Sequence, residues 1–112
     1  MTTVTIITDK EGAYKEVVCM GHAGYAKKGE PDILCAAISV LVESTVNALT
    51  ELAGEVVETI LNEETGFMRI IFSEDTPLQS HSVFMLDSLV FSLENISKQY
   101  GKKYLQVNYK EV

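Results

Sequence analysis

The sequence predicts an α+β fold, a single domain over residues 1–112 in which two long helices pack on a five-stranded sheet. Five short segments are rich in β-branched residues or alternate between apolar and polar types, as strands do. Two longer segments have the apolar spacing of helices. The elements follow one another in the order ββαββαβ without a linker, and 112 residues is the length of an ordinary domain.

The first two strands are predicted to form a hairpin. Residues 2–8 consist mainly of Thr, Val and Ile, and residues 13–21 form the second strand. Residues 9–12 provide the turn between them, with a glycine at its end. Because side chains alternate along a strand, Cys19 and His22 are expected on opposite faces of the sheet.

A loop over residues 23–31 leads to the first predicted helix. Asp32 is a suitable N-cap, because its carboxylate can accept hydrogen bonds from first-turn N–H groups. The helix is predicted from Ile33 to about Ala53 and to stop at Gly54. It is apolar around most of its circumference, so we expect it to be buried between the sheet and either the second helix or another subunit.

The second half repeats the strand, strand, helix pattern. Residues 55–62 and 67–73 are predicted strands, joined by a turn over residues 63–66, and residues 104–111 form the last strand.

The second predicted helix has a start signal and a stop signal. Thr76 is expected as N-cap, with Pro77 at the first helical position and Gln79 completing a capping box. The helix runs to about Tyr100 and ends at Gly101. Its predicted inner stripe consists of Leu78, Met85, Leu86, Leu89, Leu93 and Ile96.

The composition excludes several classes of function. Nine basic and sixteen acidic residues give a net charge of −7, which argues against nucleic-acid binding and is compatible with a basic peptide partner. No apolar run of membrane length and no signal peptide are recognised. Two cysteines without an export signal indicate free thiols in the cytoplasm. We expect no cofactor.

Cys35 is the candidate nucleophile. It stands at the third position after the predicted cap, where unpaired N–H groups and the helix dipole favour a thiolate. The alternative is that Cys35 is a small core residue, as most cysteines are.

His22 is the candidate base. It stands at a strand end with only twelve residues between it and Cys35, near enough for a loop to bring the two together. A cysteine with a histidine base is the minimal thiol-protease pair, although His22 can also be read as a surface residue.

Two polar residues near the pair have alternative roles. Asp32 is expected to cap the helix and, in addition, could orient His22. Ser39 lies one turn beyond Cys35 on the same helix face, where it can hydrogen-bond near the site or back to the helix carbonyl. A metal site is an alternative, because Cys19-x-x-His22 and Asp32-x-x-Cys35 resemble paired ligand spacings. The opposite faces of Cys19 and His22 argue against it, and Cys19 is interpreted as a buried structural thiol.

Two sequence motifs together resemble those of the ribosomal-processing cysteine protease family, Prp. The first is Gly21-His22-Ala23, and the second is Asp32-Ile33-Leu34-Cys35-Ala36-Ala37-Ile38-Ser39. The family pattern is a GHA element, a short variable loop, an aspartate, two aliphatic residues, a cysteine and a nearby serine. The length and element order also agree, so the resemblance covers the whole domain.

This resemblance implies a function and a set of site residues. Family members are homodimers that remove a short N-terminal extension from a large-subunit ribosomal protein, the one numbered twenty-seven. Their catalytic dyad corresponds to His22 and Cys35. Gly21, Asp32 and Ser39 fall on the other site positions of the family.

The resemblance also implies a gating loop and a mechanism. The loop that contains Gly24, Tyr25 and Gly29 is expected to be mobile and to order around the substrate. The oxyanion of the reaction would be held by the backbone N–H groups of Cys35 and Ala36. Two other classes of function stay open from the residues alone: a non-catalytic module that binds a ribosome-assembly partner in the same cleft, and a metal-binding regulator.

Overall fold

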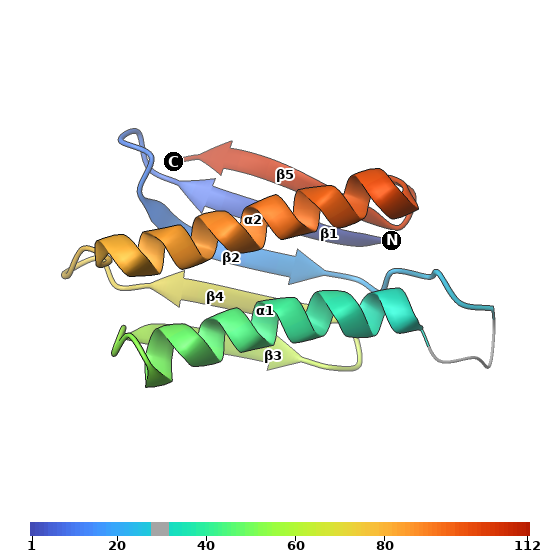
Figure 1. Cartoon of the computed structure of the whole chain (residues 1–112), viewed down its shortest axis with the longest axis horizontal. Helices are drawn as coiled ribbons and strands as arrows, with labels where there is room; N and C mark the ends of the chain where they lie inside the picture. The colour runs from blue at the N-terminus through green and yellow to red at the C-terminus, as the bar shows by residue number, and fades with distance from the viewer. Residues whose placement is uncertain (28–31) are drawn as a thin grey trace.

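A computed structural model, which describes residues 1–27 and 32–112, contains the predicted elements in the predicted order (Figure 1). The elements are β1 (Thr2–Thr8), β2 (Tyr14–Met20), α1 (Ile33–Glu51), β3 (Val57–Asn62), β4 (Phe67–Phe72), α2 (Ser80–Tyr100) and β5 (Leu105–Glu111). The α+β prediction is therefore confirmed, with each strand boundary within two residues of expectation.

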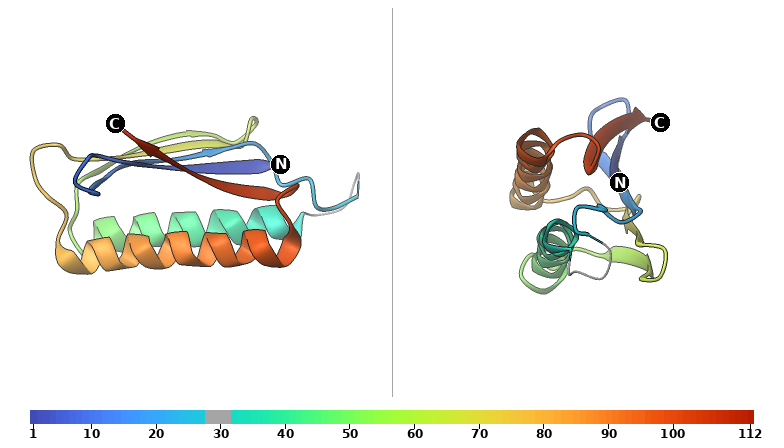
Figure 2. Two further views of the ribbon diagram at one scale, coloured as in Figure 1. Left: turned by 90° about the horizontal axis from the view of Figure 1, so that it is seen from above. Right: turned by 90° about the vertical axis from the view of Figure 1, so that its right-hand side faces the viewer.

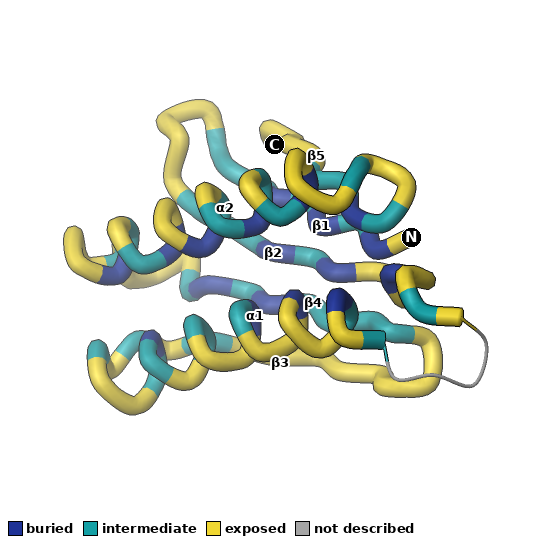
Figure 3. The backbone as a smooth tube through the Cα atoms, turned by 45° about the vertical axis from the view of Figure 1, so that its right-hand side comes forward, coloured by how far each residue is buried: buried dark blue, intermediate teal, exposed yellow. Residues whose placement is uncertain are grey.

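The five strands form one sheet in the order β3-β4-β2-β1-β5. The pairs are antiparallel except for β1 and β5, which run parallel. Both helices lie side by side on the same face of the sheet, so the molecule has two layers (Figure 2). The buried residues lie along the sides of the helices that face the sheet and along β1, β2 and β4 (Figure 3).

The first helix is less buried than its composition predicts. Leu34, Ile38, Val42 and Leu49 face the core, but Ile33 is 65% exposed and Val40 is 61% exposed. Within one chain the sheet and α2 cover only part of α1, because α2 lies beside α1 and leaves its outer side open. By length and composition alone α1 could also cross a membrane, contrary to expectation; a core helix of a soluble protein has the same composition.

The second helix begins three residues later than its capping signal predicts. Gln79, and not Thr76, precedes the first helical residue, and its side chain makes no capping hydrogen bond. Instead the Gln79 side-chain amide donates to the carbonyl of Ala53 at 2.8 Å, and its backbone N–H donates to a carboxylate oxygen of Glu55 at 3.1 Å. These contacts beyond the end of α1 replace the local capping box. The predicted inner stripe of α2 does pack on the core.

Three segments that are distant in the sequence meet at one end of the molecule. The end of β2, the turn between β3 and β4, and the first turn of α1 lie together there (Figure 1). This end contains the residues singled out from the sequence.

Candidate active site

Cys35 lies in the first turn of α1 and is half-buried. Asp32 precedes the helix as its N-cap, and its Oδ1 atom accepts the Cys35 N–H at 2.8 Å. The thiol therefore occupies the third helical position, as the sequence predicts. The first-turn N–H groups give this end of a helix a positive potential, which favours a thiolate over a thiol.

His22 follows β2 and faces the thiol. Its Nδ1 atom is 3.8 Å from Sγ of Cys35, and its Nε2 atom is 3.3 Å from the backbone carbonyl oxygen of Glu64 in the β3–β4 turn. A carbonyl can only accept, so Nε2 carries a proton in this arrangement. In the neutral ring Nδ1 then presents its lone pair to the Cys35 thiol, which is the orientation a general base requires.

Asp32 uses both carboxylate oxygens to hold backbone. Oδ1 accepts from Cys35, and Oδ2 accepts the N–H of Tyr25 at 3.0 Å. Desolvation by itself would raise the pKa of Asp32, but the N–H donors of Cys35 and Tyr25 outweigh it, so the pKa lies below its usual value. The structure thus confirms the cap. It gives the His22 ring a different partner, the Glu64 carbonyl, which the sequence did not suggest.

The two backbone groups expected to hold the oxyanion are already engaged. The Cys35 N–H donates to the Asp32 carboxylate, and the Ala36 N–H donates to the Asp32 carbonyl at 3.1 Å in the first intrahelical hydrogen bond. An oxyanion at this position would have to compete with the Asp32 carboxylate and carbonyl oxygens for these two donors.

The other site residues predicted from the sequence have different degrees of support. Gly21 and Ser39 both line the cleft at the thiol. Gly21 has φ +85°, and a Cβ atom there would lie 2.5 Å from the Met1 carbonyl oxygen, so only glycine fits. Tyr25 packs edge-on against Tyr100 and Tyr104, which anchors this part of the predicted gating loop to the end of α2. Gly24 lies in the same stretch, whereas Gly29 is outside the described residues.

A cleft of about 230 Å³ opens beside the thiol. Its walls come from β2, α1, β3, β4 and the turn between the last two. One part of the lining is apolar and consists of Ile38, Val42, Leu61, Phe67 and Met68. The acidic side chains of Glu43 and Glu63 lie at the exposed part. The cleft can therefore seat an apolar side chain next to the thiol and favours a basic segment at its mouth.

Cys19 is a second thiol on the cleft wall, but it is chemically different. It is buried in the core, and burial raises the pKa of its thiol to about 11. Few thiolates form there at neutral pH. In the two described stretches of the chain, no three His, Cys, Asp or Glu side chains converge as metal ligands would.

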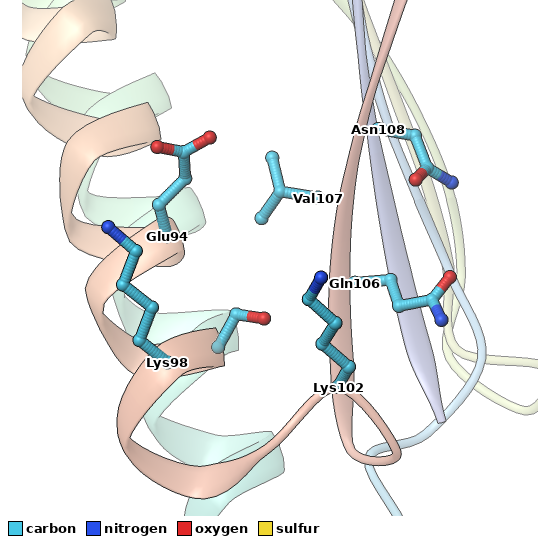
Figure 4. A pocket seen from close by; sticks show the side chains of 7 residues that line it. Glu94, Lys98, Lys102, Gln106, Val107 and Asn108 are labelled. Carbon is cyan, nitrogen blue, oxygen red and sulfur yellow. The ribbon is translucent and has the colours of Figure 1, made fainter.

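A larger hollow of about 400 Å³ lies between α2 and β5 (Figure 4). Lys98 and Lys102 border it, while Gln106 and Asn108 project from the opposite side of β5. It contains neither a thiol nor an imidazole, so size alone does not identify the reactive centre. The Cys35 cleft is smaller but brings a thiol and an imidazole together.

Comparison with known proteins agrees with this geometry. A family described as cysteine protease Prp matches residues 1–106. The chain belongs to this cysteine protease family. The Prp relative from Staphylococcus aureus, named ribosomal processing cysteine protease Prp, is 31% identical over 110 residues, which cover 98% of this chain and 100% of the relative.

Solved Prp structures share the fold. The crystal structure of the Staphylococcus aureus protease with a covalently linked product peptide matches with a TM-score of 0.86 at 28% identity, covering 98% of this chain and 100% of that one. The same protease with a substrate peptide gives 0.83 at 27% identity with the same coverage. The protein is thus a cysteine endopeptidase of the Prp family, and the non-catalytic and metal-binding alternatives are not retained.

Proposed function

We propose that this Prp protease removes a short N-terminal extension from a large-subunit ribosomal protein, the one numbered twenty-seven, with Cys35 as nucleophile and His22 as its base. The observation that carries the dyad is the 3.8 Å approach of His22 Nδ1 to Cys35 Sγ at the mouth of a cleft. The ribosomal substrate is supported by the name of the Staphylococcus aureus relative. The acidic residues at the mouth of the cleft suit a basic ribosomal peptide.

The reaction proceeds through a thioester. Nδ1 of His22 takes the thiol proton, and the Cys35 thiolate attacks the scissile carbonyl carbon. The imidazolium then protonates the leaving amine, which departs as the new N-terminus of the shortened protein. The N-terminal extension stays on Sγ as a thioester. His22 next removes a proton from water, and the resulting hydroxide releases the extension as a free acid and regenerates the thiol.

The test is cleavage of the extended ribosomal protein, followed by mass spectrometry. The wild-type protein should yield the extension and the shortened protein, whereas Cys35→Ala and His22→Ala should leave the substrate intact. Cys19→Ala is the matched control, since it removes the other thiol on the same cleft wall and should retain cleavage. Cleavage by Cys35→Ala at the wild-type rate would contradict the proposal.

The proposal includes a homodimer in the cytoplasm. Its support is the apolar surface on the outward sides of the helices, where Val40 is 61%, Phe84 73% and Phe91 65% exposed. Both cysteines are free, as a reducing compartment would keep them. Light scattering coupled to gel filtration should give twice the chain mass; a monomer at every concentration would exclude the dimer.

A further inference from the structure

We propose that the β3–β4 turn is the third member of the catalytic unit, with Asn62 as a positioning residue that holds the Glu64 carbonyl against His22. The inference rests on the proposed dyad of Cys35 and His22. In papain-like proteases an asparagine side chain orients the histidine beside the cysteine. In this protein a backbone carbonyl takes that place, and a side chain in the turn determines where the carbonyl points.

The contact between the turn and the ring selects one tautomer. The Glu64 carbonyl accepts from Nε2 at 3.3 Å, so the proton stays on the nitrogen that faces away from the thiol. The other nitrogen, Nδ1, is then free to receive the thiol proton. After that transfer both ring nitrogens carry protons, and the carbonyl continues to accept from Nε2. The turn thus stabilises the charged ring that protonates the leaving amine.

Asn62, the last residue of β3, holds the turn by side-chain hydrogen bonds to its backbone. Its side-chain oxygen Oδ1 accepts the N–H of Glu64 at 3.1 Å and the N–H of Thr65 at 3.4 Å. The Thr65 hydroxyl donates back to the Asn62 carbonyl at 3.4 Å. An asparagine that binds the backbone two residues later fixes the direction of the peptide groups between. The Glu64 peptide unit is therefore oriented by Asn62.

Gly66 lets the turn come close enough. Its φ is +66°, and a Cβ atom there would lie 2.7 Å from the Gly21 carbonyl oxygen and 3.1 Å from Cε1 of His22. Real side chains do not fit at such distances, so the end of the turn packs directly against the backbone that precedes the histidine. Two independent features, the hydrogen bonds of Asn62 and the close approach of Gly66, thus direct the same turn toward His22.

Strand pairing links the turn to the histidine. Asn62 pairs with Phe67 across the β3–β4 hairpin, and Met68 pairs with Cys19 of β2. His22 follows three residues after Cys19. The positions of the carbonyl and the ring are therefore set by one continuous part of the sheet, while Asp32, whose oxygens bind Cys35 and Tyr25, holds the thiol side.

The test compares Asn62→Ala, Asn62→Asp and Asp9→Ala. Asp9 makes the same kind of turn in the β1–β2 hairpin, where its Oδ1 accepts from Glu11 and Ala13, so Asp9→Ala is a control for loss of turn hydrogen bonds away from the site. We expect Asn62→Ala to lower kcat about tenfold to a hundredfold with little change in KM, as small misplacements of catalytic groups do. Asn62→Asp keeps the acceptor oxygen and should restore most of the rate. Asp9→Ala should leave kcat unchanged.

A spectroscopic readout needs no substrate. Nitrogen-15 NMR of the neutral His22 ring in the wild-type protein should show a proton on Nε2 and none on Nδ1. The Asn62→Ala variant should give a mixture of the two tautomers. A neutral wild-type ring protonated on Nδ1 would overturn the inference. A wild-type kcat in Asn62→Ala, or a kcat of Asn62→Asp no higher than that of Asn62→Ala, would also overturn it. If His22→Ala leaves the rate of Cys35 alkylation unchanged, the dyad of the proposed function fails, and the tautomer still reports separately on the turn.

Discussion

At the scale of single residues, Asp32 shows how one local rule has two consequences. The rule that an aspartate before a helix accepts from the third helical N–H predicts its bond to Cys35, and the structure has that bond. The same hydrogen bond occupies the Cys35 N–H, one of the two donors expected to hold the oxyanion. The Ala36 N–H is also used, because it makes the first hydrogen bond inside the helix. The cap and an oxyanion would therefore compete for the same two N–H donors.

The two cysteines should react at very different rates. Cys35 is half-buried at a helix N-terminus, while burial raises the pKa of Cys19 to about 11. Since the thiolate is the nucleophile, brief treatment with iodoacetamide at pH 7.5 (about 3.5 pH units below that value) should add one label. Intact mass should show a single adduct in the wild-type protein and none in Cys35→Ala. A label that survives in Cys35→Ala would place the reactive thiol at Cys19.

Asp32 should contribute to stability mainly as a cap. Asp32→Ala should lower the free energy of unfolding by about 1 kcal/mol. Asp32→Asn keeps an acceptor for the Cys35 N–H and should retain most of that stability, but it loses the acceptor for Tyr25, so the Tyr25 amide should exchange faster with solvent. Urea unfolding and hydrogen exchange measure the two effects. Equal stability of Asp32→Ala and the wild-type protein would exclude the cap.

The Asp32 carboxyl also predicts a pH dependence. Its folded pKa lies below the usual value, so the charged form stabilises the folded state above the unfolded pKa of about 3.9. This contribution is lost as the pH falls through the lowered folded pKa. The stability difference between the wild-type protein and Asp32→Asn should therefore shrink as the pH falls below about 4. A difference that grows on acidification would contradict the lowered pKa.

At the scale of elements, periodicity and turn residues predict where most helices, strands and turns lie. Contacts between distant elements determine the remaining boundaries. The inner stripe of α2 follows from helical spacing, and the turn at residues 63–66 follows from its glycine. The start of α2 does not, because Gln79 is held by Ala53 and Glu55, far away in the sequence. The contact of the Glu64 carbonyl with His22 could not be predicted either, since every residue has a backbone carbonyl. Only the flanking Asn62 and Gly66 indicate a special turn.

Gly66 gives the β3–β4 turn a sharp test. Gly66→Ala should lower both stability, by about 1–3 kcal/mol, and kcat, because the new methyl group meets Gly21 and His22. Gly12→Ala is the matched control: Gly12 has φ +85°, but nothing lies within 4 Å of its Cβ position. It should therefore lose stability and keep its activity. Thermal unfolding measures the stability of the two variants, and peptide cleavage measures their activity. A fully active Gly66→Ala would show that the close packing of Gly66 on Gly21 and His22 is not required.

At the scale of the whole molecule, the order of strands explains how the site is assembled. Composition and periodicity predict the ββαββαβ order, but the sheet order β3-β4-β2-β1-β5 brings the β3–β4 turn next to the end of β2. His22, the Glu64 carbonyl and Cys35 come from three different segments that meet only in the folded chain. The short loop between His22 and Cys35 can be recognised in the sequence. The pairing of β2 with β4, which brings the β3–β4 turn to His22, cannot.

The central claim, that Cys35 is the nucleophile in the His22 cleft, is tested most directly by trapping the thioester. Wild-type protein should be mixed with substrate, stopped with acid during turnover and weighed intact by mass spectrometry. The account predicts a protein heavier by the mass of the N-terminal extension less one water, with the adduct mapped to Cys35 and absent from Cys35→Ala. Turnover with an adduct on Cys19, or continued cleavage by Cys35→Ala, would contradict it.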